Sequence, residues 1–408
     1  MMGRWKVAVA VAVLAVTSLA ACGSRGGAGE QEQGAVEEGD DIKLGVQVVL
    51  TGPASFVGQG FKVGTELAVA EINANGGING HQLDVVFVDD KGTPDGGVAA
   101  VRELVDREQV FAVLGGSTST ATVAAIPYFS QNGELYYASL ASDPLVLEEF
   151  NENIFAGATI SQIDGTKAYV EHITSEVDPD SIAIMACDQA HCTSGSPLLE
   201  KQLEEAGIEV TTTATYNSGD TDFTGQIAQV RETDPDAVFI YGLAADGGRI
   251  LPQLRRAGVD VPLLGDTSLA DPSVAEVAGN AAEGFTTFWL GGTQFLTDDT
   301  GAMAEWLDSL EENVDNLPGG TPNLYSMMAY ADVYVLAEAI RQAGESPTVQ
   351  AVIDSLESDM DGFVAGEGDE WSYAAPIAQP RTFTTEDHQG NRSVTPLTVK
   401  DGEFVTAD

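Results

Sequence analysis

A short stretch of glycines and hydroxyl residues has the groups best suited to binding chemistry. The apolar run Val110–Leu114 predicts a strand, Gly115-Gly116 follow it, and Ser117–Thr120 lead into small residues that read as a helix. Glycine lets a ligand approach the backbone, a first helical turn offers unpaired N–H groups, and hydroxyls add donors. Together they predict an anion site without Lys or Arg, suited to a carboxylate. The alternative is that Ser117 or Ser119 only caps the helix.

Catalytic and metal motifs are missing from the rest of the sequence. The glycine stretch lacks the G-K-[ST] of a Walker loop, the four histidines form no H-E-x-x-H, and there is no G-x-S-x-G elbow. No nucleophile–base set is visible either. We therefore expect a chain that is not an enzyme and that holds neither a cofactor nor a metal.

Two of the three cysteines lie close together, at Cys187 and Cys192 in "ACDQAHCT". Outside the cytosol such a pair favours a disulfide, and the loop between them can fold back far enough to form one. Free thiols are one alternative. A metal site that includes the adjacent His191 is another, although no second Cys/His cluster would complete it.

The N-terminus indicates export. Arg4 and Lys6 precede the apolar run Val7–Leu19, which at about 13 residues is too short to span a bilayer, and "LAAC" ends at Cys22. These residues resemble a lipoprotein lipobox and predict a signal peptide over 1–21. They also predict a lipidated flexible tether over 22–41, which has almost no large apolar residue. The alternative is an ordinary signal peptide followed by a disordered N-terminus.

The charge is strongly acidic. The chain has 18 Lys+Arg and 63 Asp+Glu, a net charge of −45; cleavage before Cys22 removes two basic residues, so 16 − 63 gives −47. Such a surface repels nucleic acid and anionic lipid. We expect no nucleic-acid partner, and contact with a membrane only through the lipid anchor.

Strand and helix signals alternate along the chain and position these residues. Apolar strands of four to eight residues, such as "LDVVFVDD" and "SIAIMACD", are separated by helical faces, and the pattern restarts near Ser181. This arrangement predicts an α/β fold with two doubly wound parallel sheets. From Phe285 we expect a strand, helices at Ala302–Glu312 and Tyr325–Ala343, and antiparallel strands with turns at His388–Asn391 and Asp401-Gly402.

Several long motifs carry a resemblance to a known family. "TGP" after the first strand, "INANGGINGHQLDVVFVDD", "AVFIYG…GGRILPQLRRAGV" and "LLGDTSLADPSVAEVAGNAAEGF" resemble the type I solute-binding proteins of ABC importers, specifically the leucine/isoleucine/valine-binding family. The resemblance implies lobe 1 at 42–158 and 287–392, and lobe 2 at 159–286 and 393–408. Three crossings would join the lobes near Gly157–Ile160, Phe285–Phe288 and Arg392–Pro396. The ligand would lie between closing lobes.

The resemblance also implies a set of contact residues. The ligand carboxylate would meet the Gly116 loop, with Ser117 as the contact residue, beside Ser142 and the backbone of Leu140. The aromatic position near the first strand holds Val57, and those in the second lobe fall near His191 and on Leu243. The acidic position that pairs with an ammonium falls on Thr267, so Asp266 or Asp246 would have to replace it. The full candidate set is Phe56, Val57, Gly116, Ser117, Thr118, Leu140, Ser142, Gln162, His191, Leu243, Asp266 and Thr267.

These observations predict an extracytoplasmic receptor anchored by lipid on Cys22. It would capture a small carboxylate-bearing solute, a branched-chain or related amino acid, and deliver it as a monomer to an ABC permease in the membrane. A sensor that signals to a membrane partner is an alternative function. A non-amino carboxylic acid or an amide is an alternative ligand.

Overall fold

A computed structural model describes residues 36–37, 39–146, 152–290, 324–358, 382–391 and 394–407. The predicted signal peptide, most of the predicted tether, Cys22 and the helix expected at Ala302–Glu312 lie outside these residues. Part of the crossing expected at Arg392–Pro396 also lies outside them. Within the described chain, no helix combines the length and the apolar character needed to cross a bilayer.

The first sheet is parallel throughout. Its strand order is β11-β5-β4-β3-β1-β2, formed by β1 (Ile42–Val48), β2 (Leu83–Asp89), β3 (Ala112–Gly115), β4 (Leu135–Ala138), β5 (Ile154–Ile160) and β11 (Gln389–Asn391). All residues of β3 and β4 are buried, which explains their continuous apolar sequences.

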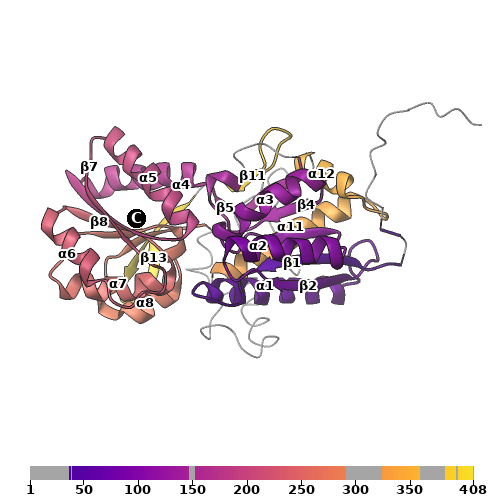
Figure 1. Cartoon of the computed structure of the whole chain (residues 1–408), viewed down its shortest axis with the longest axis horizontal. Helices are drawn as coiled ribbons and strands as arrows, with labels where there is room; N and C mark the ends of the chain where they lie inside the picture. Colours follow the sequence, from indigo (N-terminus) through magenta and orange to yellow (C-terminus); the bar gives the residue numbers. More distant parts are fainter. Residues whose placement is uncertain are drawn as a thin grey trace, which may run out of the picture. The chain divides into compact units, whose positions relative to one another are not determined.

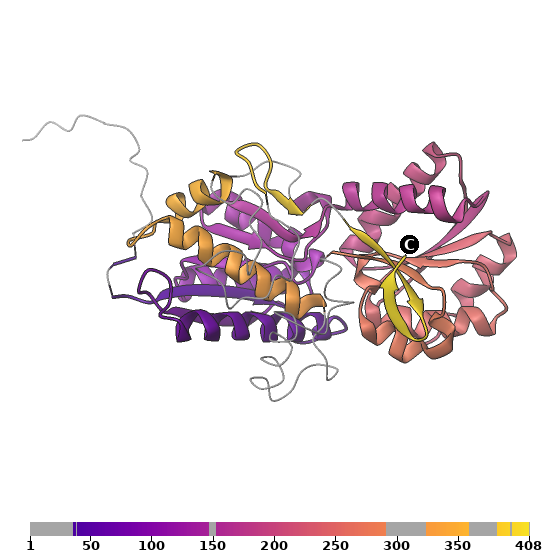
Figure 2. The ribbon, with the colours of Figure 1, turned by 180° about the vertical axis from the view of Figure 1, so that it is seen from behind.

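Helices cover both faces of this sheet. Helix α1 (Ser55–Ala74) packs against α11 (Leu324–Gln342), which also contacts α12 (Val349–Ser358), whereas α2 (Pro94–Arg102) packs against α3 (Ser119–Asn132). Figure 1 shows α2 and α3 on the near face, and Figure 2 shows α11 and α12 from behind. A glycine allows the close packing of α1 on α11, because a Cβ at Gly64 would lie 1.9 Å from the Ser326 carbonyl oxygen.

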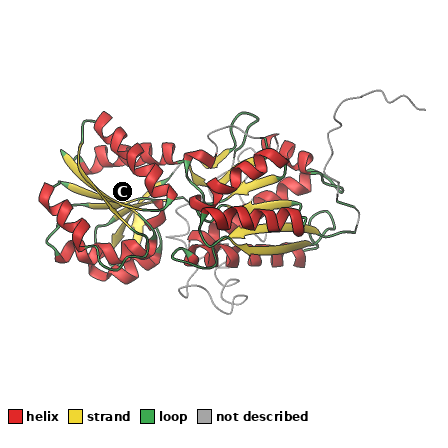
Figure 3. Cartoon of the chain, in the orientation of Figure 1, coloured by secondary structure: helices red, strands yellow, loops and turns green. Residues whose placement is uncertain are grey.

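The second sheet has the order β13-β12-β10-β9-β8-β6-β7 and is parallel except at β12, which pairs antiparallel with β10 and β13. Its strands are β6 (Ser181–Cys187), β7 (Glu209–Tyr216), β8 (Ala237–Tyr241), β9 (Leu263–Gly265), β10 (Thr286–Trp289), β12 (Thr395–Lys400) and β13 (Glu403–Thr406). Helices α4 (Gln162–His172) and α5 (Ala190–Glu205) pack together, as do α7 (Ala244–Arg256) and α8 (Pro272–Ala278). Together with α6 (Thr224–Thr233) they enclose the strands in helices, as in the first sheet (Figure 3). The prediction of two doubly wound sheets is confirmed.

One C-terminal prediction is wrong. His388–Asn391 is not a turn between antiparallel strands: Gln389–Asn391 forms β11, which pairs parallel with β5 in the first sheet. The strand is polar, and hydrogen bonds from buried Gln389 to the carbonyls of Thr159 and Asn391 support it. Because hydrophobic periodicity detects only apolar strands, it could not reveal this one. The predicted turn at Asp401-Gly402 is present between β12 and β13.

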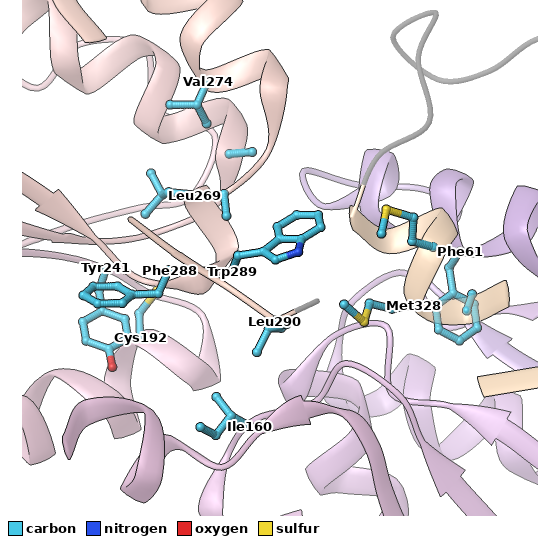
Figure 4. Close-up of a cluster of buried hydrophobic side chains, with 14 of the residues drawn as sticks. Phe61, Ile160, Cys192, Tyr241, Leu269, Val274, Phe288, Trp289, Leu290 and Met328 are labelled. Carbon is cyan, nitrogen blue, oxygen red and sulfur yellow. The ribbon is translucent and has the colours of Figure 1, made fainter. Parts of the chain in front are cut away.

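The sheet to which each strand belongs can be compared with the lobe boundaries expected from the sequence. Strand β5 keeps its place in the first sheet to Ile160, and β10 pairs with β12 to Trp289, so both strands run past the boundaries expected at 158/159 and 286/287. Figure 4 shows part of the buried apolar cluster around these segments. Trp289 is the last residue of β10 and Leu290 follows it, while Phe61 and Met328 come from α1 and α11.

Candidate functional site

The glycine–hydroxyl stretch forms the turn between β3 and α3. Gly116 has a φ of +80°, and a Cβ there would lie 3.0 Å from the backbone of Ala138 and Ser139. Both observations require glycine at this position. Ser117 is buried, and its hydroxyl accepts a 3.0 Å hydrogen bond from the Val49 N–H, which leaves its O–H available as a donor.

Neither serine of this stretch caps α3. Ser119 Oγ accepts hydrogen bonds from the N–H groups of Ser142 and Asp143 at 3.1 and 3.3 Å. Thr118 holds the N-cap position without a side-chain cap bond. Its buried Oγ1 also has no hydrogen-bond partner within the described part of the chain. The first turn of α3 therefore offers backbone N–H groups and an unpaired hydroxyl.

Helices α5, α6 and α7 of the second sheet also begin without side-chain caps. The N-cap residues Gln189 of α5 and Leu243 of α7 make no cap bond, whereas Ser161 caps α4. The starts of α3 and α5 are in contact, because Thr120 Oγ1 accepts a 3.2 Å hydrogen bond from the Ala190 N–H. Uncapped helix N-termini carry partial positive charge and unpaired donors, a combination that favours an anion.

Gln162 joins the two groups of loops. It is buried, its Nε2 donates to Ser142 Oγ at 2.8 Å, and its Oε1 accepts from the Tyr241 hydroxyl at 2.9 Å. Gln162 belongs to the candidate set predicted from the sequence, whereas Tyr241 does not, because its strand "DAVFIYGL" reads only as buried core. No local signal distinguishes its hydroxyl from those of other core tyrosines.

An apolar cluster lies beside these polar groups. Val57 and Leu243 are buried in it together with Val49, Ala54 and Tyr325, and Phe56 and Leu140 pack against it. The Phe56 and Tyr325 rings meet edge to face with centroids 5.8 Å apart. Four of the predicted candidates therefore come together. Tyr325 was missed, because "NLYSMMAY" predicts a packed helix and no more.

Asp266, which precedes Thr267, is the acidic residue at this position of the second sheet. Its side chain is almost fully buried, with Oδ1 accepting from the Gly242 N–H at 3.2 Å and Oδ2 lying 3.9 Å from His191 Nε2. Burial raises the pKa of Asp266 to about 7. The Thr267 hydroxyl lies 3.5 Å from the Tyr169 hydroxyl instead.

His191 is held next to Asp266 by the start of α5. Burial lowers the pKa of its imidazole to about 4, against the opposing effects of the Gly242 backbone and the Asp143 charge. The ring is therefore neutral at pH 7. The predicted disulfide between Cys187 and Cys192 is present, with Cα atoms 5.4 Å apart, and joins the end of β6 to the first turn of α5. His191 and both sulfurs lie within 4.8 Å of one another, but the sulfurs are bonded to each other and do not act as thiolate ligands.

The sequence matches the family model described as periplasmic binding protein over residues 41–403. It is 27% identical over 308 residues to the leucine-, isoleucine-, valine-, threonine- and alanine-binding protein of Pseudomonas aeruginosa, covering 75% of this chain and 80% of that protein. It is 28% identical over 318 residues to a Leu/Ile/Val-binding protein homolog of Brucella melitensis, covering 78% and 83%.

Solved structures share the fold. A branched-chain amino acid transporter substrate binding protein from Streptococcus pneumoniae, in complex with isoleucine, matches with a TM-score of 0.73 and 24% identity over 90% of this chain and all of that one. A solute binding protein of an ABC transporter from Rhodopseudomonas palustris, in complex with 3,4-dihydroxybenzoic acid, matches with a TM-score of 0.75 and 17% identity, covering 90% and 96%. The family match spans nearly all of the described residues and both sheets. The chain belongs to the periplasmic binding protein family, whose members bind solutes and are not enzymes.

Proposed function

We propose that the chain is the receptor of an ABC importer and binds a small amino acid with an apolar stem. One observation carries the proposal: a series of hydrogen bonds through Ser142, Gln162 and the end of β8 links the uncapped start of α3, with its unpaired Thr118 hydroxyl, to the buried Asp266. An α-amino acid offers a matching carboxylate, ammonium and side chain. The names of the P. aeruginosa and Brucella relatives support this ligand class.

The carboxylate would bind at the start of α3. The backbone N–H groups of the first turn, the Ser117 O–H and the Thr118 hydroxyl are donors, and the helix dipole adds favourable charge. Hydrogen bonds to a charged acceptor contribute about 1.5–3 kcal/mol each, more than bonds between neutral groups.

The ammonium would bind at Asp266. In the structure the Asp266 carboxyl is buried beside a histidine that is neutral at pH 7, so its charged form lacks a positive partner there. An ammonium would supply that charge, favour the ionised carboxylate and offset its desolvation. The ligand's apolar atoms would then contact Val57, Leu243 and Tyr325, which are already clustered.

A plain carboxylic acid is a second candidate, and a specific observation favours it. Because the pKa of Asp266 is about 7, a protonated Asp266 is accessible near neutral pH and could donate a hydrogen bond to a ligand that has no ammonium. The R. palustris neighbour bound to 3,4-dihydroxybenzoic acid shows that this fold accepts such ligands.

Calorimetric titration with leucine and with 4-methylpentanoate, which is leucine without its ammonium, tests the carboxylate site. Ser117→Ala should weaken both ligands by about 1–3 kcal/mol, because both present a carboxylate to the same donors. The control is Ser130→Ala, which removes an exposed hydroxyl from the same helix and should change neither affinity. Unchanged affinity for both ligands in Ser117→Ala would overturn the α3 site.

The anchor and the permease complete the proposal. Lipid on Cys22 would hold the receptor at the membrane, and stable anchoring takes more than one acyl chain. Cys22→Ser should move the protein into the soluble fraction without changing leucine affinity. Retention of the variant on the membrane would refute lipid anchoring while leaving the ligand site untouched.

A further inference from the structure

We propose that the ligand site extends into an acidic subsite, formed by Asp188, Ser218 and Asp246, that binds the cationic end of the ligand's side chain. The inference rests on the proposed function and refines it from a small amino acid to a basic one. The three residues follow the carboxyl ends of β6, β7 and β8. Ligands of parallel α/β sheets bind at this edge.

Unpaired buried oxygens mark the subsite. Within the described residues, five buried side-chain oxygens lack a hydrogen-bond partner: Thr118 Oγ1, Ser218 Oγ, Asp246 Oδ2, Glu134 Oε2 and Gln202 Oε1. The first three lie at the carboxyl edges of the two sheets, in loops or, for Asp246, in the first turn of α7, and Thr118 is already assigned to the carboxylate. A buried acceptor without a partner is costly, so Asp246 Oδ2 indicates a missing donor at the same edge, while the Ser218 hydroxyl lies close enough to Asp188 to lower the pKa of that carboxyl.

Asp246 is the central group. It is 1% exposed, and its Oδ1 accepts a 3.0 Å hydrogen bond from the Gly219 N–H, which leaves Oδ2 unpaired. Its place in the first turn of α7 explains why an acid is tolerated there but not why this oxygen is buried. Burial raises the pKa of Asp246, while the Gly219 N–H and the Arg249 charge lower it, and a further donor or cation at Oδ2 would favour the charged form.

Ser218 and Asp188 adjoin Asp246 through one turn. The Ser218 N–H donates to Asp188 Oδ1 at 2.9 Å, and the next residue's N–H, from Gly219, donates to Asp246. Consecutive peptide groups therefore hold the two carboxylates close together. Asp188 is exposed, so it places a charge at the opening of the subsite, while the Ser218 hydroxyl lies buried within it.

The subsite adjoins the groups assigned to the amino acid. Gly242 donates its N–H to Asp266, and a Cβ at Gly242 would lie 3.9 Å from Asp246 Cβ. Leu243, part of the apolar cluster, is the N-cap of the helix that carries Asp246. A ligand held by Asp266 could therefore run an aliphatic stem along Leu243 and reach Asp246 with its end.

The charges favour a cation. The Arg249 guanidinium lies 3.8 Å from Asp246 Oδ1, too far for a hydrogen bond, and is half-exposed. Two carboxylates therefore outweigh one guanidinium. Calcium would need six to eight oxygen ligands, more than these residues provide, whereas an ammonium needs about three acceptors. A net charge of −45 also attracts a cationic solute at long range.

Calorimetric titration with lysine and norleucine tests the subsite, because the two differ only by the ε-ammonium. The unmodified protein should bind lysine at least about tenfold more tightly, the least expected of a charge-assisted hydrogen bond. Asp246→Asn should remove this preference and leave norleucine affinity unchanged. Ser218→Ala should reduce the preference less, and it stays informative if Asp246→Asn fails to fold. Asp260→Asn, the same charge change at an exposed position, should change neither ligand.

Three outcomes would overturn the subsite: equal affinity for the two ligands, a preference for norleucine, or a lysine preference that survives in both Asp246→Asn and Ser218→Ala. In each of them norleucine still binds, and the proposed amino-acid function stands. If none of lysine, norleucine and leucine binds, both the proposed function and the subsite are refuted.

Discussion

The loops after the first sheet present hydroxyl and backbone donors, whereas those after the second sheet present buried carboxylates and a histidine. The hydroxyls of Ser117 and Thr118 are free to donate hydrogen bonds without a change of charge, and the helix dipole of α3 is fixed. Asp266 and His191 lie 3.9 Å apart, and burial shifts both their pKa values toward the neutral forms. The loops after the first sheet form one half of the site and should accept any carboxylate. The loops after the second sheet form the other half and should determine which further group, such as an ammonium, the ligand needs for binding.

The largest effect should come from Asp266→Asn. Without a carboxylate, the bound ammonium of leucine would be buried unpaired, and affinity should fall by about 3–5 kcal/mol. The affinity for 4-methylpentanoate should change little, because this acid has no ammonium. Titration of both ligands checks this, with Asp260→Asn as the exposed control. Equal losses of affinity for the two ligands would show that Asp266 does not bind the ammonium specifically.

The pH dependence of stability should reveal the two titrating groups. The pKa of Asp266 is about 7 in the folded chain against an ordinary 3.8, so between these values the folded state binds the extra proton and stability falls as pH rises. The pKa of His191 is about 4 against 6.5, so over this range the unfolded state binds the extra proton and stability rises with pH. The two slopes oppose each other in the unmodified protein.

Single variants should separate these slopes. Relative to the unmodified protein, Asp266→Asn should gain stability with rising pH between about 4 and 7. His191→Gln should lose stability over about 4–6.5. Urea unfolding at several pH values measures both differences in the free energy of unfolding, which should reach a few kcal/mol at most. Curves parallel to that of the unmodified protein would show that neither group titrates in this range.

Among the described residues, only the half of the site on the second sheet has a disulfide. Replacing both Cys187 and Cys192 by Ser should lower the free energy of unfolding by about 2 kcal/mol, because the closed loop is short. The Cys192 sulfur lies 3.3 Å from His191 Nε2, so leucine affinity should also fall, although carboxylate recognition at α3 is retained. If 4-methylpentanoate weakens as much as leucine, the disulfide supports both halves.

The sequence predicted the fold well and the site unevenly, for physical reasons. Buried parallel strands are continuous apolar runs, so the sequence predicts both sheets. The glycines around Gly116 indicate a turn in which the backbone conformation leaves no room for a side chain. The polar strand β11 and the hydroxyls of Tyr241 and Tyr325 were not visible, because their roles depend on partners far away in sequence. Asp266 was found only by its proximity to Thr267, since burial, which makes its carboxyl distinctive, is a property of the fold.

The smallest effect concerns the unpaired hydroxyl of the first half. Thr118→Val keeps the shape of the side chain but removes a buried oxygen that has no partner within the described residues. Without ligand, the variant should be more stable by up to about 1 kcal/mol, since an unsatisfied polar group is lost, while carboxylate affinity should fall by a similar amount. Thr122→Val makes the same change at a hydroxyl that already donates to the Thr118 carbonyl at 2.8 Å, so it should lose stability and leave affinity unchanged. Thermal unfolding and 4-methylpentanoate titration give both quantities. If the Thr118 hydroxyl serves the ligand, Thr118→Val should raise stability and lower carboxylate affinity. A loss of both stability and affinity would show instead that the hydroxyl supports the fold.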